Sequence, residues 1–278
     1  MLKAETLSTV NKPMTLAEME NLSKVDTRIK PMLREMFRFP EGKHGIERST
    51  LKSEGIQRIN DIVMFHKFAM YIHEANREVI DPIFEQFNAH YGNMFDGAQE
   101  DQEDQEDQEK VTQYRMTFRN FDEKEQLRRV GLLADESLVI NLWATIEQFA
   151  NRSIDLFQPN KKKSYKWLEI EDKFLNLGLN LQNAMSYKIV NELRVLNNHI
   201  KHTYMVADSL VKFDNFVDYK GKTIDQVPLK TFDYTLAAYN FVCLVINRIG
   251  ESIYYPFDES DDLEEEEYSE LLKTHKEN

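Results

Sequence analysis

Residues 186–204 read SYKIVNELRVLNNHIKHTY, and this stretch combines apolar residues at helical spacing with a dense set of polar side chains. At about 100° per residue, a helix brings four apolar residues within roughly 60° of one another: Ile189, Leu193, Leu196 and Ile200. Five polar residues fall within an arc of roughly 140° on the opposite side: Arg194, Asn197, Asn198, Lys201 and His202. His199 lies about 60° outside that arc. The pattern predicts a helix with one packed face and one polar face, which is either a functional surface or an ordinary solvated one.

The composition predicts an all-α fold, a bundle of helices. The chain has 278 residues, of which 41% are hydrophobic, with only 9 Gly and 7 Pro. Helix-breaking residues are therefore scarce, and the apolar runs are long and have helical period. The single cysteine, Cys243, lies in the apolar run YNFVCLVI, which predicts a buried thiol and excludes an intrachain disulfide.

The same features predict a cytoplasmic protein with no membrane partner. One cysteine suits a reducing compartment. The first twenty residues contain no apolar core of signal-peptide length, and no apolar run approaches the roughly 18 residues of a membrane span.

The formal net charge of −13 is concentrated in two segments. Residues 98–110 carry seven acidic residues and one lysine, and residues 258–278 carry ten acidic residues and two lysines. Their net charges of −6 and −8 leave +1 for the remainder of the chain. The charge balance of the helical parts therefore neither supports nor excludes an anionic ligand.

Four parts are expected along the chain: an N-terminal helical region (1–97), an acidic linker (98–110), a second helical domain (111–257) and an acidic tail (258–278). The linker repeats a Gln-Glu-Asp unit and has almost no apolar residues to offset the entropy of ordering, so we expect it to be disordered. It is either a solvated spacer, a mimic of nucleic acid or a gate over a basic site.

The expected helices cover about 15–38, 53–87, 121–157, 167–177, 186–204 and 231–254. Thr15 is a candidate N-cap with an acidic first turn, and Pro82 is expected to kink or divide its helix. The pattern over 121–157 is one helix or two joined near Gly131. A turn is expected at Gly221. The helix over 231–254 is apolar on most sides, which predicts a central place in the bundle.

Motifs for the common enzyme classes are absent from the sequence: there is no Gly-rich phosphate loop, HExxH, GxSxG or Cys/His zinc spacing. His66 and His73 are seven residues apart and share a helix face, but no acidic ligands accompany them, so neither a metal site nor a cofactor is expected. Lys161, Lys162 and Lys163 precede Tyr165 and Trp167; they either bind a phosphate backbone or form a solvated loop.

The polar face of 186–204 has the chemistry to cleave RNA without a metal. Arginine binds phosphate through two hydrogen bonds, histidine transfers protons near neutral pH, and an amide orients a hydroxyl or phosphate oxygen. The nucleophile is the 2′-hydroxyl of the substrate itself.

Residues 120–255, roughly half of the chain, resemble the HEPN superfamily. The resemblance rests on ELRVLNNHIKHT, which follows the aromatic-rich LWATIEQFANRSIDLF and precedes a long apolar closing helix. The family motif is an Arg, usually followed by a polar residue such as Asn, with a His four to six residues after the Arg.

Two alignments with that motif are possible. In the first, Arg194 pairs with His199, but Val195 stands where the polar residue is expected. In the second, Asn198 and His202 match the motif's Asn and His, and Asn197 stands where the arginine is expected. The helical wheel favours the second, because His202 shares a face with Arg194 and Asn198.

The resemblance implies a metal-independent endoribonuclease of a bacterial toxin or phage-defence system, with one site formed by two copies in a homodimer. It implies His202 as general acid and base, Arg194 as phosphate clamp, Asn198 as orienting amide and His199 as the alternative histidine. Expected RNA-binding residues are Asn197, Lys201 and the three lysines 161–163. The alternative is a non-catalytic HEPN-like module that dimerises or docks onto a partner, such as an antitoxin protein or RNA.

Overall fold

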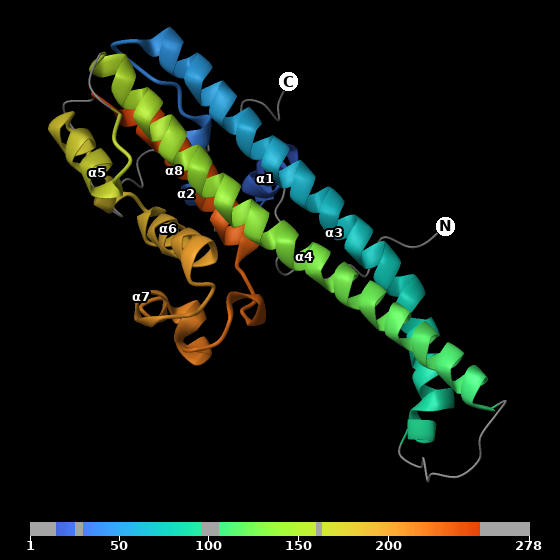
Figure 1. The fold of residues 1–278 in the computed structure, drawn as a ribbon. Coiled ribbons are helices and arrows are strands. Elements are labelled where there is room, and N and C mark those ends of the chain that lie inside the picture. Colours follow the sequence, from blue (N-terminus) through green and yellow to red (C-terminus); the bar gives the residue numbers. More distant parts are fainter. Residues whose placement is uncertain (1–14, 26–29, 96–105, 160–162, 251–278) are drawn as a thin grey trace, which may run out of the picture. The chain divides into compact units, whose positions relative to one another are not determined.

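The computed structural model describes residues 15–25, 30–95, 106–159 and 163–250 (Figure 1). These residues form helices and connecting loops, with no strand beyond an isolated antiparallel bridge between Met205 and Thr223. The predicted all-α bundle is confirmed. The α-helices are α1 (Leu16–Val25), α2 (Lys30–Phe37), α3 (Gly45–Phe95), α4 (Glu106–Phe157), α5 (Trp167–Asn176), α6 (Tyr187–His202), α7 (Asp208–Val211) and α8 (Thr231–Arg248). Short 3₁₀ helices lie at Leu181–Asn183, Asp214–Tyr219 and Ile224–Gln226.

The chain divides into two compact units. Unit 1 comprises Met1–Asp61 and Val139–Asn278, and unit 2 comprises Ile62–Leu138. This grouping differs from the expected regions 1–97 and 111–257. Within unit 1, α2 packs on α8.

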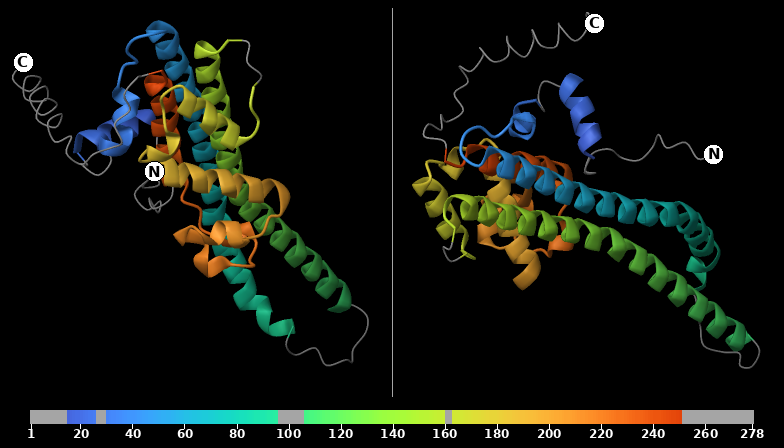
Figure 2. Two further views of the ribbon diagram at one scale, coloured as in Figure 1. Left: turned by 90° about the vertical axis from the view of Figure 1, so that its left-hand side faces the viewer. Right: turned by 90° about the horizontal axis from the view of Figure 1, so that it is seen from above.

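Helix α8 is the centre of unit 1, as its apolar sequence predicts (Figures 1 and 2). Every residue from Tyr234 to Asn247 is buried, Cys243 completely. The helix ends at Arg248 rather than at the expected residue 254. Ile249 is extended and Gly250 has a φ of +76°, a left-handed conformation that favours glycine and ends a helix.

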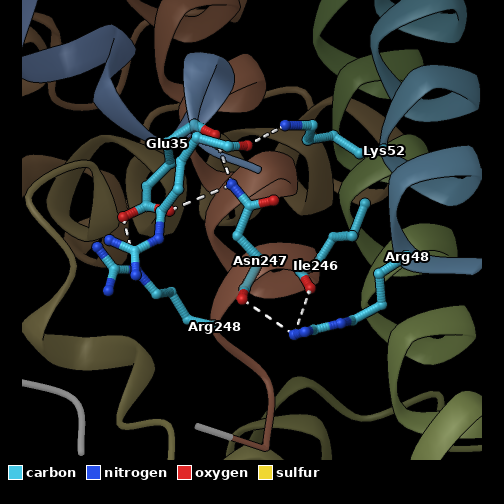
Figure 3. Close-up of polar contacts among 7 residues, drawn as sticks. Glu35, Arg48, Lys52, Ile246, Asn247 and Arg248 are labelled. Atoms are coloured by element: carbon cyan, nitrogen blue, oxygen red, sulfur yellow. Dashed lines mark hydrogen bonds and ion pairs between the residues drawn. The ribbon is translucent and has the colours of Figure 1, made fainter. Parts of the chain in front are cut away.

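Buried charged side chains attach the early helices to the C-terminal end of α8 (Figure 3). The Arg48 guanidinium in α3 donates to the backbone carbonyls of Ile246 (3.4 Å), Asn247 (3.0 Å) and Ile249 (3.2 Å). The last carbonyls of a helix have no partners within the helix, so Arg48 acts as a cap supplied from a distant part of the chain.

Lys52, one turn after Arg48 in α3, makes a second buried contact. Its ammonium donates to the carbonyl of Met36 at 3.4 Å and to that of Arg38. These two residues lie at and just beyond the end of α2. Burial lowers the pKa of Lys52, and the nearby Cys243 and Glu35 act in the opposite direction. Lys52 therefore joins α3 to the end of α2.

The N-terminal segment forms two helices, α1 and α2, where one helix over 15–38 was expected. Residues 26–29 lie outside the described part. The predicted cap at Thr15 is confirmed. Its hydroxyl accepts from the Glu18 N–H at 3.4 Å, and the Glu18 carboxylate accepts from the Thr15 N–H at 2.6 Å, a reciprocal capping box.

The two long helices are less interrupted than the sequence suggests. Helix α4 runs unbroken through Gly131, and Pro82 does not divide α3. The expectation of a disordered linker over 98–110 is wrong for residues 106–110, which belong to α4, while residues 98–105 lie outside the described part. Gln, Glu and Lys are good helix formers, and they extend a helix whose later turns are packed.

In unit 2, the 62–95 part of α3 lies alongside the 106–138 part of α4 (Figure 2). His66 Nε2 is 2.6 Å from a carboxylate oxygen of Asp135, and the His73 ring packs close to the Cα of Gly131. Both histidines therefore face α4.

Candidate functional site

Helix α6 packs on α8 and places most of its apolar residues as predicted. Leu193 and Leu196 are completely buried, as is Val190, while Ile189 and Ile200 are half-buried. The buried side is therefore wider than the predicted stripe and includes Val190.

Asn197 belongs to this buried side, not to the polar face on which it was predicted to bind RNA. It is 2% exposed, its side-chain Nδ2 donates to Asn198 Oδ1 at 3.4 Å, and its Oδ1 is buried without a hydrogen-bond partner. Asn197 lies at the edge of the polar arc next to the apolar stripe, and the buried side is wide enough to include it. The residue aligned with the motif's arginine is thus inaccessible to a ligand.

Arg194 lies half-buried on the polar side, and a neighbour within α6 fixes its orientation. Its Nε and Nη2 both donate to Asn191 Oδ1, at 3.0 Å and 2.8 Å. Because one amide oxygen receives both bonds, the remaining guanidinium N–H groups keep their capacity to donate to an anion.

Glu147 in α4 is the acidic neighbour of this face. Burial raises the pKa of Glu147, and the charge of Lys201, a hydrogen bond from Trp143 and the charge of Arg194 oppose that rise. Helices α4 and α6 therefore place one partly buried carboxyl group next to the two cations. A bound phosphate would share these cations with Glu147.

The remaining predicted residues of α6 lie near its end. Asn198, Lys201 and His202 are exposed, and Asn198 and His202 are one helical turn apart. In contrast, His199 is half-buried, with its Nδ1 2.9 Å from Thr203 Oγ1 and its Nε2 2.6 Å from Ser209 Oγ. Both ring nitrogens of His199 are engaged, Nδ1 with Thr203 at the C-cap of α6 and Nε2 with Ser209 of α7, which it joins to the end of α6.

Lys163 is exposed, and Lys161 and Lys162 lie outside the described residues. Of the two aromatic neighbours, Tyr165 is exposed, but Trp167 is buried with its ring 4.9 Å from that of Trp143 and 6.0 Å from that of Phe241. Only Tyr165 could therefore stack on a base next to Lys163.

Two carboxylates of this region were not identified from the sequence. Glu192 is buried, accepts a hydrogen bond from the Tyr234 hydroxyl at 2.8 Å and lies 3.8 Å from the Lys230 ammonium; burial raises its pKa. In the sequence, the feature that could have indicated the burial of Glu192 is its position one helical turn before Leu196.

Glu171 in α5 is the second carboxylate that was not identified from the sequence. One of its carboxylate oxygens accepts from Trp167 Nε1 at 2.9 Å and from the Tyr187 hydroxyl. Burial, and then the hydrogen bond to Glu171, raise the pKa of Tyr187 to about 12. This pair joins α5 to the first turn of α6 and so helps to orient the helix.

Among residues 15–25, 30–95, 106–159 and 163–250, no group of three or more His, Cys, Asp or Glu side chains is arranged to hold a metal ion. No helix within the same ranges has the length and apolar character needed to cross a membrane. No protein-family model, curated protein or solved structure matches the chain.

Proposed function

We propose that the chain is a HEPN-like protein that cleaves RNA without a metal ion, in a homodimer that brings together the polar faces of two α6 helices. The proposal rests on one observation, which is how the candidate residues of α6 differ in exposure and in hydrogen bonding. His202 and Asn198 are exposed next to the half-buried Arg194, whereas both ring nitrogens of His199 have partners. His202 is therefore the histidine available for proton transfer.

The reaction requires only the groups on this face. The RNA 2′-hydroxyl loses its proton to a His202 imidazole and attacks the adjacent phosphorus, and the bond from phosphorus to the 5′ oxygen breaks. His202 of the second copy, in its protonated form, gives a proton to that leaving oxygen. The products are a 2′,3′-cyclic phosphate and a 5′-hydroxyl. Arg194 and Lys201 bind the phosphate, and Asn198 orients it.

A second candidate function, a non-catalytic HEPN-like module that binds RNA or a partner protein, is favoured by one observation. Asn197, aligned with the motif's arginine, is buried, so the guanidinium must come from Arg194, one turn earlier. When the guanidinium lies one turn from its place in the motif, the face retains phosphate binding more readily than RNA cleavage, because catalysis requires closer positioning of the reacting groups.

The test is cleavage of single-stranded RNA by the purified chain in EDTA. We expect fragments ending in cyclic phosphate, and a loss of roughly 10²–10⁴-fold in rate for His202→Ala. The matched control is His199→Ala on the same helix, which should retain cleavage. Circular dichroism should show the same thermal unfolding for wild type and His202→Ala.

Two outcomes would reject the nuclease. One is intact RNA with the wild-type chain, and the other is cleavage unaffected by either histidine substitution. RNA binding without cleavage, weakened by Arg194→Ala, would instead support the non-catalytic module. For the toxin or phage-defence role, expression of the chain in bacteria should arrest growth, and His202→Ala should relieve that arrest.

A further inference from the structure

A row of large apolar side chains lies exposed on α3 within unit 2. Its three aromatic members are Phe65, Phe68 and Tyr71, which are 61%, 64% and 66% exposed. Met64 and Ile72 complete the row and are also exposed. These five residues, called the outer stripe below, follow the spacing of one helix face, three or four residues apart.

The outer stripe lies on the side of α3 away from α4. Ile62, Val63 and His66 form the inner side, all buried, and His66 contacts Asp135 of α4. At about 100° per residue, Phe68 projects roughly 160° from His66 around the helix. This part of α3 is therefore apolar on two opposite sides, a pattern typical of a helix packed on both.

The size of the outer stripe suits a protein interface. A large aromatic side chain has a surface of roughly 150–250 Å², so three of them exposed by about three-fifths, with Met64 and Ile72, present roughly 500 Å². Two such surfaces together bury about 1,000 Å², the smallest area typical of a specific contact.

The outer stripe is also symmetric about its central residue. Phe65 and Tyr71 lie three residues on either side of Phe68, and Met64 and Ile72 lie four. When two copies of the helix cross antiparallel at Phe68, a two-fold axis pairs aromatic with aromatic and aliphatic with aliphatic. A second copy of the same chain presents this matching pattern by symmetry, because an isologous interface uses the same surface twice.

We propose that the outer stripe is the interface of a homodimer in which two α3 helices pack antiparallel, with the two Phe68 rings at the two-fold axis. Lys67 is the only charged residue between Met64 and Ile72, and it projects outside the arc of the stripe. The contact therefore brings no like charges together at its centre. The proposal concerns unit 2. This contact holds together the homodimer that the proposed function requires, so the α6 faces alone do not keep the two copies associated, and its test does not involve RNA cleavage.

The test is the mass of the full chain in solution, measured by light scattering during size-exclusion chromatography. The chain of 32.9 kDa should elute as a dimer. Phe68→Glu places two carboxylates at the axis and should shift the protein to the monomer at the same concentration. The matched control is Ile46→Glu, the same type of change at another exposed apolar residue of α3, which should leave the dimer intact.

A cross-linking experiment tests the geometry of the interface. Phe68→Cys should form a disulfide-linked dimer under mild oxidation, whereas Ile46→Cys should not. The background is clean because the native Cys243 is completely buried. Circular dichroism shows whether each variant keeps the wild-type fold.

A monomeric wild-type chain would overturn the proposal. A dimer that survives Phe68→Glu and shows no Phe68→Cys cross-link would overturn the proposal as well. This includes a dimer in which residues 251–278 of the same chain, and not a second copy, cover the outer stripe. A dimer lost on substitution of α6 but not of Phe68 would reject this interface while leaving the proposed nuclease standing.

Discussion

Arg248, the last residue of α8, donates a hydrogen bond from Nε to a carboxylate oxygen of Glu35 in α2 at 2.8 Å (Figure 3). Glu35 is 1% exposed, and Asn247 Nδ2 donates to its backbone carbonyl at 2.6 Å and to its other carboxylate oxygen at 3.3 Å. The carboxylate is thus satisfied on both oxygens in the interior of unit 1. This arrangement fixes α2 at one position along α8.

Removing Glu35 should strongly destabilise the protein. Breaking a buried ion pair by deleting one partner costs about 3–5 kcal/mol, and here the half-buried Arg248 guanidinium would lose the carboxylate that it contacts. Denaturant-induced unfolding should show a fall of this size for Glu35→Ala. The control is Asp208→Ala, which breaks the exposed 2.7 Å pair with Lys220 and should change the free energy of unfolding little. Equal losses in the two variants would refute the structural role of the buried pair.

Gly55→Ala should destabilise the protein although alanine is the better helix former. The added Cβ would lie 2.8 Å from Val242 Cγ1 and 3.3 Å from the Phe149 ring. Overpacking costs about 1–3 kcal/mol, which exceeds the gain of about 1 kcal/mol in helix propensity. Thermal unfolding measures the net effect.

Gly131→Ala in α4 is the matched control for this prediction. Its Cβ would approach only the His73 side chain, at 3.3 Å, so the helix-propensity gain should leave stability equal or slightly higher. An increase in stability for Gly55→Ala would show that α3 can move away from α8 at this point.

Asn197→Arg, which restores the arginine of the motif, should impair the protein rather than activate it. The position is 2% exposed, and an unpaired buried charge costs several kcal/mol. We expect a fall in the thermal unfolding temperature and no gain in RNA cleavage. Asn198→Arg, at the exposed neighbouring position, should keep the wild-type unfolding temperature. A stable and more active Asn197→Arg variant would place that side chain on the accessible face.

Glu192 should make stability depend on pH. Burial raises the pKa of this carboxyl above its ordinary value in the unfolded chain. Its stabilising contribution is therefore fully present below the unfolded pKa, near 4.5, and is lost as the pH rises through the higher folded pKa. Glu192→Gln cannot ionise and keeps an oxygen that accepts from Tyr234.

The measurement is the free energy of unfolding at pH 4 and at pH 7 for both proteins. The difference between the two pH values, taken as stability at pH 4 minus stability at pH 7, should be smaller in Glu192→Gln than in wild type. Glu169→Gln, on the exposed side of α5, controls for the loss of one charge. An unchanged pH dependence in Glu192→Gln would show that Glu192 ionises as it does in the unfolded chain.

Local patterns predicted the helices well where apolar spacing was long and regular. The apolar run of α8 and the capping box of Thr15 follow from neighbouring residues, and both were identified. The extension of α4 into the acidic repeat does not follow from the charge and polarity of that repeat, which predict disorder, although its Gln, Glu and Lys residues favour a helix. The end of α8 depends on Gly250 and on Arg48, a residue about two hundred positions earlier.

The candidate site shows the same limit. A helical wheel placed Arg194, Asn198 and His202 on one side of α6, and the structure agrees for these three. The wheel could not determine whether Asn197 and Glu192 are buried, because they border the apolar stripe on its two sides and the packing around α6 decides how wide the buried side is. One partner of His199, Thr203, lies one helical turn later and could be expected from spacing, but the other, Ser209, comes from α7, where spacing alone gives no guidance.

The caps on α8 also govern the order in which the chain can fold during synthesis. Glu35 and Arg48 leave the ribosome about two hundred residues before the carbonyls and guanidinium that they contact in α8. At roughly 5–20 residues per second, that gap lasts about 10–40 s. During this interval the apolar faces of α2 and of the first turns of α3 have no α8 to cover them. Unit 1 is therefore completed only after translation has passed Arg248.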